Sequence, residues 1–202
     1  MAKTATVYVV DDDLSVRKGL ARLIKSVGYR VMTFASAKAY LKNTPCEGPS
    51  CLVLDVRMPE ISGIDLQKRL ASSTLDLPVI FITGHGTVPM SVKALKAGAV
   101  DFIEKPFDEQ TLLDAISAAI ERDKAAKQER ADILKIKKNL GSLTPRENEV
   151  FHLVVQGRLN KQIAAETGTS EKTVKVHRAR VMKKMQADSL ADLVRMATKV
   201  DH

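Results

Sequence analysis

The first 123 residues of the chain alternate between short runs rich in β-branched residues and longer amphipathic segments. The runs have the length and composition of buried strands and lie at residues 5–10, 29–34, 51–55, 77–83 and 100–104. Between them, segments such as LSVRKGLARLIKSVG place apolar residues at helical spacing. Because strict alternation requires crossover connections, it predicts an α/β fold with a doubly wound, five-stranded parallel sheet.

Acidic residues follow two of the predicted strands. The first run continues into Asp11 and Asp12, and the apolar run CLVL ends in Asp55. The carboxyl ends of parallel strands open at one edge of the sheet, where ligands bind in such folds. Three carboxylates brought together there repel one another unless a cation joins them, and oxygen ligands suit Mg²⁺. The sequence therefore predicts a magnesium site at Asp11, Asp12 and Asp55.

Two further polar residues are expected at the same edge. Thr83 ends the run at residues 77–83, and Lys105 follows the run at residues 100–104. A lone threonine or lysine at a strand end is commonplace, and an acidic run after a strand is often only a turn. Their joint appearance at the ends of successive strands favours a site for phosphoryl transfer onto an aspartate, with Asp55 as the acceptor.

A long helical pattern separates this region from the rest of the chain. It runs from Glu109 to residue 140 without proline or glycine, so a continuous helix would be about 48 Å long. Residues 121–132 offer only alanine as an apolar contact, which predicts a solvated linker helix; a coiled coil remains an alternative, although charged residues interrupt the heptad. We expect a first domain at 1–123, a helical linker at 124–141 and a second domain at 142–202.

The last 60 residues carry the start and stop signals of several short helices. Thr144 begins the capping box T-P-R-E, Asn160 is expected to cap NKQIAAET, and Gly168 to end it. Ser170 is expected to cap EKTVKVHRARVMKKM. Helix, tight turn and helix at this spacing predict an all-α helix-turn-helix domain.

The charge of the chain is divided unevenly between its two parts. Residues 1–123 hold 15 Lys and Arg against 15 Asp and Glu, whereas residues 124–202 hold 17 against 9, which accounts for the whole net charge of +8. A neutral domain followed by a basic one indicates that the second meets nucleic acid. No apolar run approaches the roughly 20 residues that span a bilayer, so we expect a cytoplasmic protein with no membrane partner.

Four stretches resemble the receiver domain of two-component response regulators, most of all the FixJ subfamily: VVDDD, LVLDVRMPEISG, ITGHGTVPMSVKALKAG and DFIEKPF. The resemblance implies a flavodoxin-like fold and a sensor histidine kinase that phosphorylates Asp55. It further implies that Asp12, Asp55 and the backbone carbonyl of Arg57 hold Mg²⁺, with Asp11 acting through water, and that Lys105 neutralises the phosphoryl group.

The same resemblance implies a conformational switch. Thr83 would move its hydroxyl to the phosphoryl group while the ring of Phe102 turns inward. The bond between Lys105 and Pro106 is expected to be cis, as in the family.

The second domain resembles the LuxR/NarL-type DNA-binding domain through residues 142–185. The positions at which the resemblance implies DNA contacts are Lys161, Thr173, Lys175, Val176, His177 and Arg180. Of these, Lys175 and Val176 would meet bases, and Lys161, Thr173 and His177 would lie nearer the DNA backbone. Where NarL-type domains carry a further base-contacting lysine, this chain has Ala179, so the site preference of those domains does not transfer.

These features together predict a phosphorylation-dependent transcription regulator that is not an enzyme. Once phosphorylated on Asp55, it would form a homodimer, bind double-stranded promoter DNA and activate transcription through RNA polymerase. One alternative is a Mg²⁺-dependent aspartyl-phosphate phosphatase, although no second acid lies two residues after Asp55 and no cap domain could enclose a substrate. Another is a receiver-type interaction module that is never phosphorylated, although every residue expected at the site is present.

Overall fold

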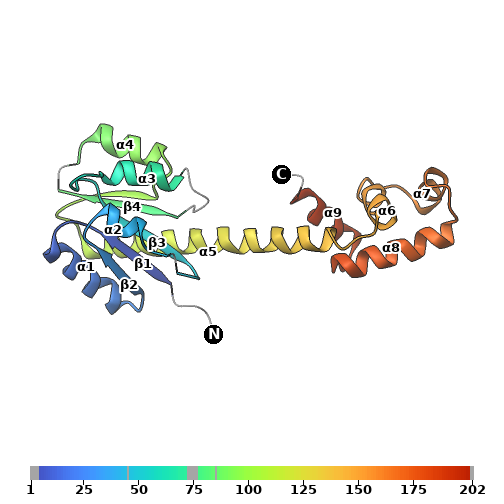
Figure 1. Cartoon of the computed structure of the whole chain (residues 1–202), viewed down its shortest axis with the longest axis horizontal. Helices are drawn as coiled ribbons and strands as arrows, with labels where there is room; N and C mark the ends of the chain where they lie inside the picture. The colour runs from blue at the N-terminus through green and yellow to red at the C-terminus, as the bar shows by residue number, and fades with distance from the viewer. Residues whose placement is uncertain (1–4, 45, 72–76, 85, 201–202) are drawn as a thin grey trace. The chain divides into compact units, whose positions relative to one another are not determined.

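The computed structural model describes residues 5–44, 46–71, 77–84 and 86–200. Contacts between residues divide the chain into two compact units, Met1–Lys127 and Gln128–His202. The helix α5 (Glu109–Leu140) runs without a break through the boundary, which confirms the predicted continuous helix (Figure 1).

The first unit is built on a five-stranded sheet in which every neighbouring pair is parallel. Its strands are β1 (Thr6–Val10), β2 (Arg30–Phe34), β3 (Ser50–Asp55), β4 (Val79–Thr83) and β5 (Asp101–Glu104). Their order is β2-β1-β3-β4-β5, which is the flavodoxin-like order of a doubly wound sheet. Every residue of β1, β3 and β4 is buried, as expected for apolar runs in the middle of a parallel sheet.

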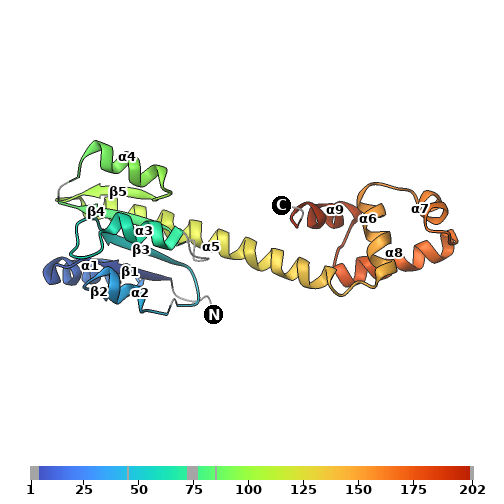
Figure 2. The same ribbon diagram turned by 45° about the horizontal axis from the view of Figure 1, so that its top comes forward.

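Helices cover both faces of this sheet (Figures 1 and 2). They are α1 (Leu14–Ser26), α2 (Ala37–Leu41), α3 (Gly63–Ala71), α4 (Val88–Lys96) and the first part of α5. Because successive strand residues point to opposite faces, Tyr8, Leu52 and Phe81 pack with α2, α3 and α4, whereas Val9 and Val53 pack with α1 and α5. The two apolar layers fix the sheet and leave the carboxyl ends of its strands open.

Polar contacts hold the middle of α5 to the first unit. The Asp123 carboxylate is buried and accepts hydrogen bonds from the Ser50 backbone N–H at 2.6 Å and from Lys127 Nζ at 2.7 Å. Lys127 Nζ also donates to the Gly48 carbonyl at 2.6 Å. The expectation that residues 121–132 are simply solvated is therefore wrong at these two positions, because charged side chains and not apolar ones make the contact with the start of β3.

The second unit is all-helical, as predicted. Besides the end of α5 it contains α6 (Pro145–Val155), α7 (Asn160–Glu166), α8 (Glu171–Met185) and α9 (Leu190–Thr198). Its core is formed by apolar residues from these helices, among them Val150, Ile163, Val174, Val181 and Leu193. Across the part of the chain that the structure describes, no helix combines the length and apolar character needed to cross a membrane.

Two of the three predicted helix caps in this unit are confirmed. Thr144 and Glu147 form the capping box of α6, and the Ser170 hydroxyl accepts the Thr173 N–H at 3.1 Å at the start of α8. The prediction for Asn160 is wrong, because Asn160 is the first residue inside α7 and its side chain accepts a hydrogen bond from Arg178 Nη1 at 3.0 Å. Contact with α8 has taken the side chain away from the cap.

Candidate functional site

An open cleft of about 450 Å³ lies at the carboxyl edge of the sheet. Residues at the ends of β1, β3 and β4 and after β5 line it, as the strand-end pattern predicts. The predicted site residues on its walls are Asp11, Asp12, Asp55, Arg57, Thr83 and Lys105. The sheet therefore gathers side chains that are up to 94 positions apart in the sequence.

Lys105 joins the two buried carboxylates of this cleft. Its Nζ lies 2.8 Å from Asp11 Oδ2 and 3.1 Å from Asp55 Oδ1. Asp11 is only 1% exposed and Asp55 only 6% exposed. Two carboxylates at such depth are tolerated because the lysine ammonium offsets their charge and donates a hydrogen bond to each.

The pKa values at this bridge reflect burial and pairing together. Burial raises the pKa of the Asp55 carboxyl above its ordinary value, and the hydrogen bond from Lys105 lowers it only in part. Burial lowers the pKa of Lys105, but hydrogen bonds and attraction from Asp11 and then Asp55 outweigh it, so the pKa of the ammonium is raised. The lysine stays charged at neutral pH and provides a fixed positive charge beside Asp55.

The backbone around Asp55 is held as closely as its side chain. Asp55 Oδ2 accepts the backbone N–H of Arg57 at 2.9 Å, and the Gly63 N–H donates to the Val56 carbonyl at 3.0 Å. A Cβ on Gly63 would lie 2.2 Å from the Asp55 carbonyl oxygen, so only glycine permits α3 to begin here. Sequence reasoning did not single out Gly63, although a glycine soon after a strand-end aspartate was a visible signal for such a close approach.

The two acids of the turn after β1, Asp11 and Asp12, differ from each other in burial and in hydrogen bonding. Asp11 Oδ1 accepts the Asp13 N–H at 2.8 Å, whereas the Asp12 side chain is exposed. Arg17, which sequence reasoning also missed, donates through Nη1 to the carbonyl oxygens of Asp11 at 2.7 Å and Asp12 at 2.8 Å. Asp11, Asp12 and Asp55 thus line one cleft, but only Asp11 and Asp55 are joined by Lys105, and the Asp12 side chain is exposed.

The donor set of the cleft nevertheless fits Mg²⁺. Within the described ranges no group of three or more His, Cys, Asp or Glu side chains is arranged to hold a metal ion. Mg²⁺ needs only one or two protein carboxylates, because it keeps several of its waters. Asp12, Asp55 and Arg57 line the same cleft, so two carboxylates and a backbone carbonyl could supply the few protein oxygens that Mg²⁺ requires.

The two residues expected to form a switch lie on neighbouring strands. Thr83 at the end of β4 is buried and lines the cleft, and Phe102 on β5 is half-buried with its ring centroid 6.1 Å from that of Phe81. A Cβ on Gly86 would lie 3.1 Å from the Phe102 ring and 3.3 Å from Thr83 Cγ2. The peptide bond between Lys105 and Pro106 is cis, as expected.

The second unit presents most of the predicted DNA-contacting side chains to solvent. On α8, Val174, Val181 and Met185 are buried, whereas Lys172, Lys175, Arg180 and Lys183 are exposed. Exposed side chains among the predicted positions are Lys161, Thr173, Lys175, Val176 (46%) and Arg180. His177 is half-buried, and within the described part of the chain its Nδ1 is enclosed without a hydrogen-bond partner. Thr173 Oγ1 lies 2.9 Å from the hydroxyl of the capping Ser170.

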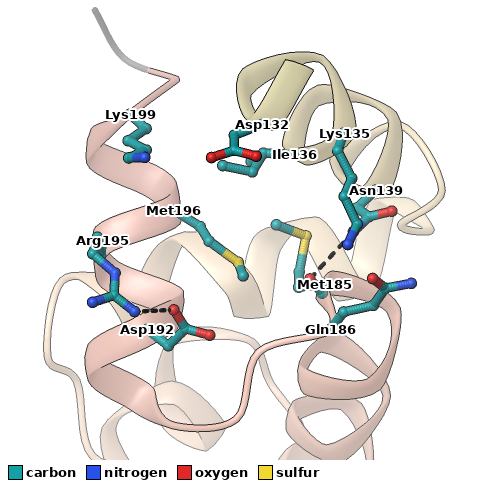
Figure 3. A pocket seen from close by; sticks show the side chains of 10 residues that line it. All are labelled: Asp132, Lys135, Ile136, Asn139, Met185, Gln186, Asp192, Arg195, Met196 and Lys199. Atoms are coloured by element: carbon teal, nitrogen blue, oxygen red, sulfur yellow. Dashed lines mark hydrogen bonds and ion pairs between the residues drawn. The ribbon is translucent and has the colours of Figure 1, made fainter. Parts of the chain in front are cut away.

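A separate pocket of about 250 Å³ lies within the second unit, between the end of α5, the end of α8 and α9 (Figure 3). Ile136, Met185 and Met196 form its apolar part, and the Asn139 side chain donates to the Met185 carbonyl at 3.2 Å. Charged side chains, including Lys135 and Lys199, stand at its sides. None of these residues belongs to the predicted site.

Comparisons with known proteins agree with this geometry. The family described as "Response regulator receiver domain" matches residues 7–117, and that described as "Bacterial regulatory proteins, luxR family" matches residues 141–197. Nodulation protein W of Bradyrhizobium diazoefficiens is 51% identical over 96% of this chain and 85% of its own length. Transcriptional regulatory protein FixJ of Rhizobium meliloti is 47% identical over 95% of this chain and 94% of its own.

A solved structure of the response regulator StyR covers 97% of this chain and 99% of its own, with 47% identity and a TM-score of 0.87. A solved structure of full-length FixJ from B. japonicum covers 100% of this chain and 98% of its own, with 42% identity and a TM-score of 0.60. One matched family covers the receiver fold and the other covers the helix-turn-helix, and each of these relatives spans both. The chain therefore belongs to the two-component response regulators that join a receiver domain to a LuxR-type DNA-binding domain, and it acts as a transcriptional regulator, not as an enzyme.

Proposed function

We propose that a sensor histidine kinase phosphorylates Asp55 and that the phosphorylated protein forms a homodimer that binds promoter DNA. The observation that carries this proposal is the bridge from Lys105 to Asp55 and Asp11 in an open cleft. A carboxylate with one oxygen on a fixed ammonium and the other on the Arg57 N–H is held in one orientation toward the cleft. We assign phosphorylation to residues 1–123, the linker to 124–141 and DNA binding to 142–202.

Phosphoryl transfer would proceed by attack of an Asp55 oxygen on the phosphorus of the kinase phosphohistidine. The new O–P bond forms as the N–P bond breaks, and the imidazole keeps the electron pair of the broken bond. Asp12, Asp55 and the Arg57 carbonyl would hold Mg²⁺, with Asp11 acting through a water molecule. When bound, the ion supplies positive charge to the transferring phosphoryl oxygens.

The new phosphoryl group would then change the cleft through its charge. It adds about −1.5 to −2 charge at neutral pH. Lys105 is placed to pair with it, and the Thr83 hydroxyl on the wall of the same cleft is placed to donate to it. Movement of Thr83 would open space beside β5, into which the half-buried Phe102 ring can turn. The surface of α4 and β5 is thereby repacked and becomes the candidate dimer contact.

In the second unit we propose that α8 enters the major groove of double-stranded DNA. Lys175 and Val176 would contact bases, because both are exposed on the helix surface opposite the core. Lys161, Thr173, His177 and Arg180 would contact the DNA backbone or the groove edge. Bound to a promoter in the cytoplasm, the dimer would activate transcription through contact with RNA polymerase.

Light scattering tests the proposal. Wild-type protein is measured with and without magnesium chloride and beryllofluoride, a phosphoryl mimic, alongside Asp55→Asn and the control Asp65→Asn. Asp65 is an exposed acid on α3 whose partners are Ser62 and Lys68. We expect wild type and Asp65→Asn to shift from monomer to dimer and Asp55→Asn to stay monomeric.

Mass spectrometry after treatment with acetyl phosphate gives a second, independent readout of the same proposal. A phosphoryl adduct on wild type that is absent from Asp55→Asn is expected. An unmodified wild type would favour the interaction-module alternative. An adduct without a change in mass by scattering would refute dimerisation while leaving Asp55 as the acceptor.

A further inference from the structure

A single arginine outside the predicted set of site residues binds the turn that carries two of the acids. Arg17 lies in the first part of α1, and its Nη1 donates to the carbonyl oxygens of both Asp11 and Asp12, at 2.7 and 2.8 Å. Both hydrogen bonds are charge-assisted, so they are stronger than ordinary bonds between neutral groups. Arg17 is itself fixed, because its N–H donates to the Asp13 carbonyl at 3.0 Å and Asp13 caps α1.

The two carbonyls that Arg17 binds belong to the peptide units on either side of the Asp12 Cα. A donor that holds both peptide planes restricts the backbone dihedrals of Asp12, and these set the direction in which its side chain leaves the chain. The Asp12 side chain is exposed, and none of the described residues donates a hydrogen bond to its carboxylate. Its direction therefore depends on the backbone that Arg17 holds.

We propose that Arg17 is a positioning residue that orders the acidic turn after β1 and thereby raises the affinity of the protein for Mg²⁺. This inference rests on the proposed function, since it takes Asp12 and Asp55 as magnesium ligands. Removal of a group that orients a metal ligand without binding the metal itself typically weakens metal affinity by about 10-fold to 100-fold. Arg17 would act in this way through the backbone and without touching the ion.

Positioning and simple electrostatics predict opposite results for the removal of Arg17. A guanidinium close to a cation site repels the cation, so the loss of its charge alone would tighten Mg²⁺ binding. The loss of positioning would weaken Mg²⁺ binding, because the ligands would have to be ordered when the ion binds. The sign of the change in affinity therefore distinguishes the two roles.

The experiment titrates magnesium chloride into full-length wild type, Arg17→Ala, Arg17→Lys and the control Lys18→Ala, followed by amide chemical shifts. Lys18 is the exposed neighbour of Arg17 on α1. We expect Arg17→Ala to bind Mg²⁺ about 10-fold more weakly than wild type. We expect Arg17→Lys to lie between the two, because a lysine keeps the charge with a shorter reach, and Lys18→Ala to match wild type.

Hydrogen exchange in metal-free protein supplies a readout that does not require the ion. The Asp13 N–H, which is bonded to Asp11 Oδ1 at 2.8 Å, should exchange several-fold faster in Arg17→Ala, and exchange in the strands should not change. If Arg17→Ala does not fold, the comparison of Arg17→Lys with wild type decides the sign. Equal or tighter binding in a folded Arg17 variant would overturn the inference alone. Failure of wild type to bind Mg²⁺ would overturn the proposed metal site as well.

Discussion

At the scale of residues, the Asp55 site depends on backbone packing as much as on charge. Gly63 allows α3 to begin against the carbonyl of Asp55, and the Arg57 N–H binds the carboxylate of the same residue. A small displacement of this carbonyl would move the carboxylate relative to Lys105. The position of the carboxylate that we propose as the phosphoryl acceptor thus depends on a residue that has no side chain.

Substitution of Gly63 provides a direct test. We expect Gly63→Ala to lower the free energy of unfolding of the first unit by about 1–3 kcal/mol, because the new methyl group collides with rigid backbone. Phosphorylation by acetyl phosphate should also slow. Tyrosine fluorescence in urea follows this unit selectively, because Tyr8, Tyr29 and Tyr40 are its tyrosines and the chain has no tryptophan.

Gly19→Ala is the matched control for that measurement. Gly19 lies inside α1, and apart from its chain neighbours and the backbone of its own helix no described atom lies within 4 Å of an added Cβ. Alanine is favoured over glycine in a helix by about 1 kcal/mol, so this variant should be more stable than wild type. Equal behaviour of the two variants would show that the contact at Asp55 carries no strain.

The sequence was informative about side chains at strand ends and uninformative about groups that act through the backbone. Strand ends converge in any parallel sheet, so Asp11, Asp55, Thr83 and Lys105 could be placed on one cleft before the fold was known. Arg17 binds carbonyl oxygens, and every residue has one, so no residue type in the sequence marks its target. The exposure of Asp12 likewise depends on local dihedrals that spacing does not encode.

At the scale of elements, an ion pair between a buried carboxylate and a half-buried lysine links α6 to α8. Glu147 is 4% exposed at its side chain, and its carboxylate lies 2.6 Å from Lys184 Nζ while it also accepts the Thr144 N–H at 2.9 Å. The hydrogen bond from Lys184, followed by that from Thr144, lowers the pKa of Glu147 from 4.5 to about 2. The capping box therefore also serves as a contact between helices.

This pair predicts how the second unit responds to acid. Because the pKa of Glu147 is lower in the folded state, its contribution to stability is complete above pH 4.5 and is lost as the pH falls toward 2. A carboxyl carbon NMR titration should give a pKa near 2 in wild type and a value closer to 4.5 in Lys184→Met. Lys183→Met, which removes an exposed neighbouring charge, should leave it near the wild-type value; an unchanged pKa in Lys184→Met would contradict the assignment.

Two predictions about elements were wrong for a common reason. Asn160 was expected to cap α7 and residues 121–132 to be solvated, yet Asn160 binds Arg178 and Asp123 binds the start of β3. In both cases a polar side chain meets a partner that is distant in the sequence. Local patterns describe helix ends well, as Thr144 and Ser170 show, but they do not contain such tertiary partners.

At the scale of the whole molecule, the two parts of the chain differ in net charge. The excess of positive charge lies after residue 123, in the part that contains the match to the LuxR family at residues 141–197. Contacts with phosphates release counterions, so each one contributes to the salt dependence of binding. Exposed lysines of the second unit that contact phosphates should therefore contribute to the salt dependence of DNA binding, whereas those that contact bases should contribute mainly to its sequence preference.

Lys161 and Lys175 allow this division to be measured. With a duplex selected by beryllofluoride-activated protein, we expect Lys161→Ala to weaken binding to selected and unrelated DNA alike and to reduce the salt slope by about 1. Lys175→Ala should mainly reduce the preference for the selected duplex, by about 1–3 kcal/mol. Lys137→Ala removes an equal charge from α5 and serves as the control. If Lys161→Ala changed only the sequence preference, the proposed roles would be wrong.

The polar contacts of Asp123 and Lys127 also define where the receiver can be exchanged by protein engineering. When a foreign receiver is joined to this DNA-binding unit inside α5, Asp123 and Lys127 should be exchanged together with the receiver whose sheet they contact. A junction placed before Asp123 would carry Asp123 and Lys127 into the hybrid without the Ser50 N–H and the Gly48 carbonyl that they bind in this receiver. A junction after Lys127 leaves both residues and their partners on the receiver side of the fusion. Residue 128 is therefore the preferred starting point of the DNA-binding part in a hybrid response regulator.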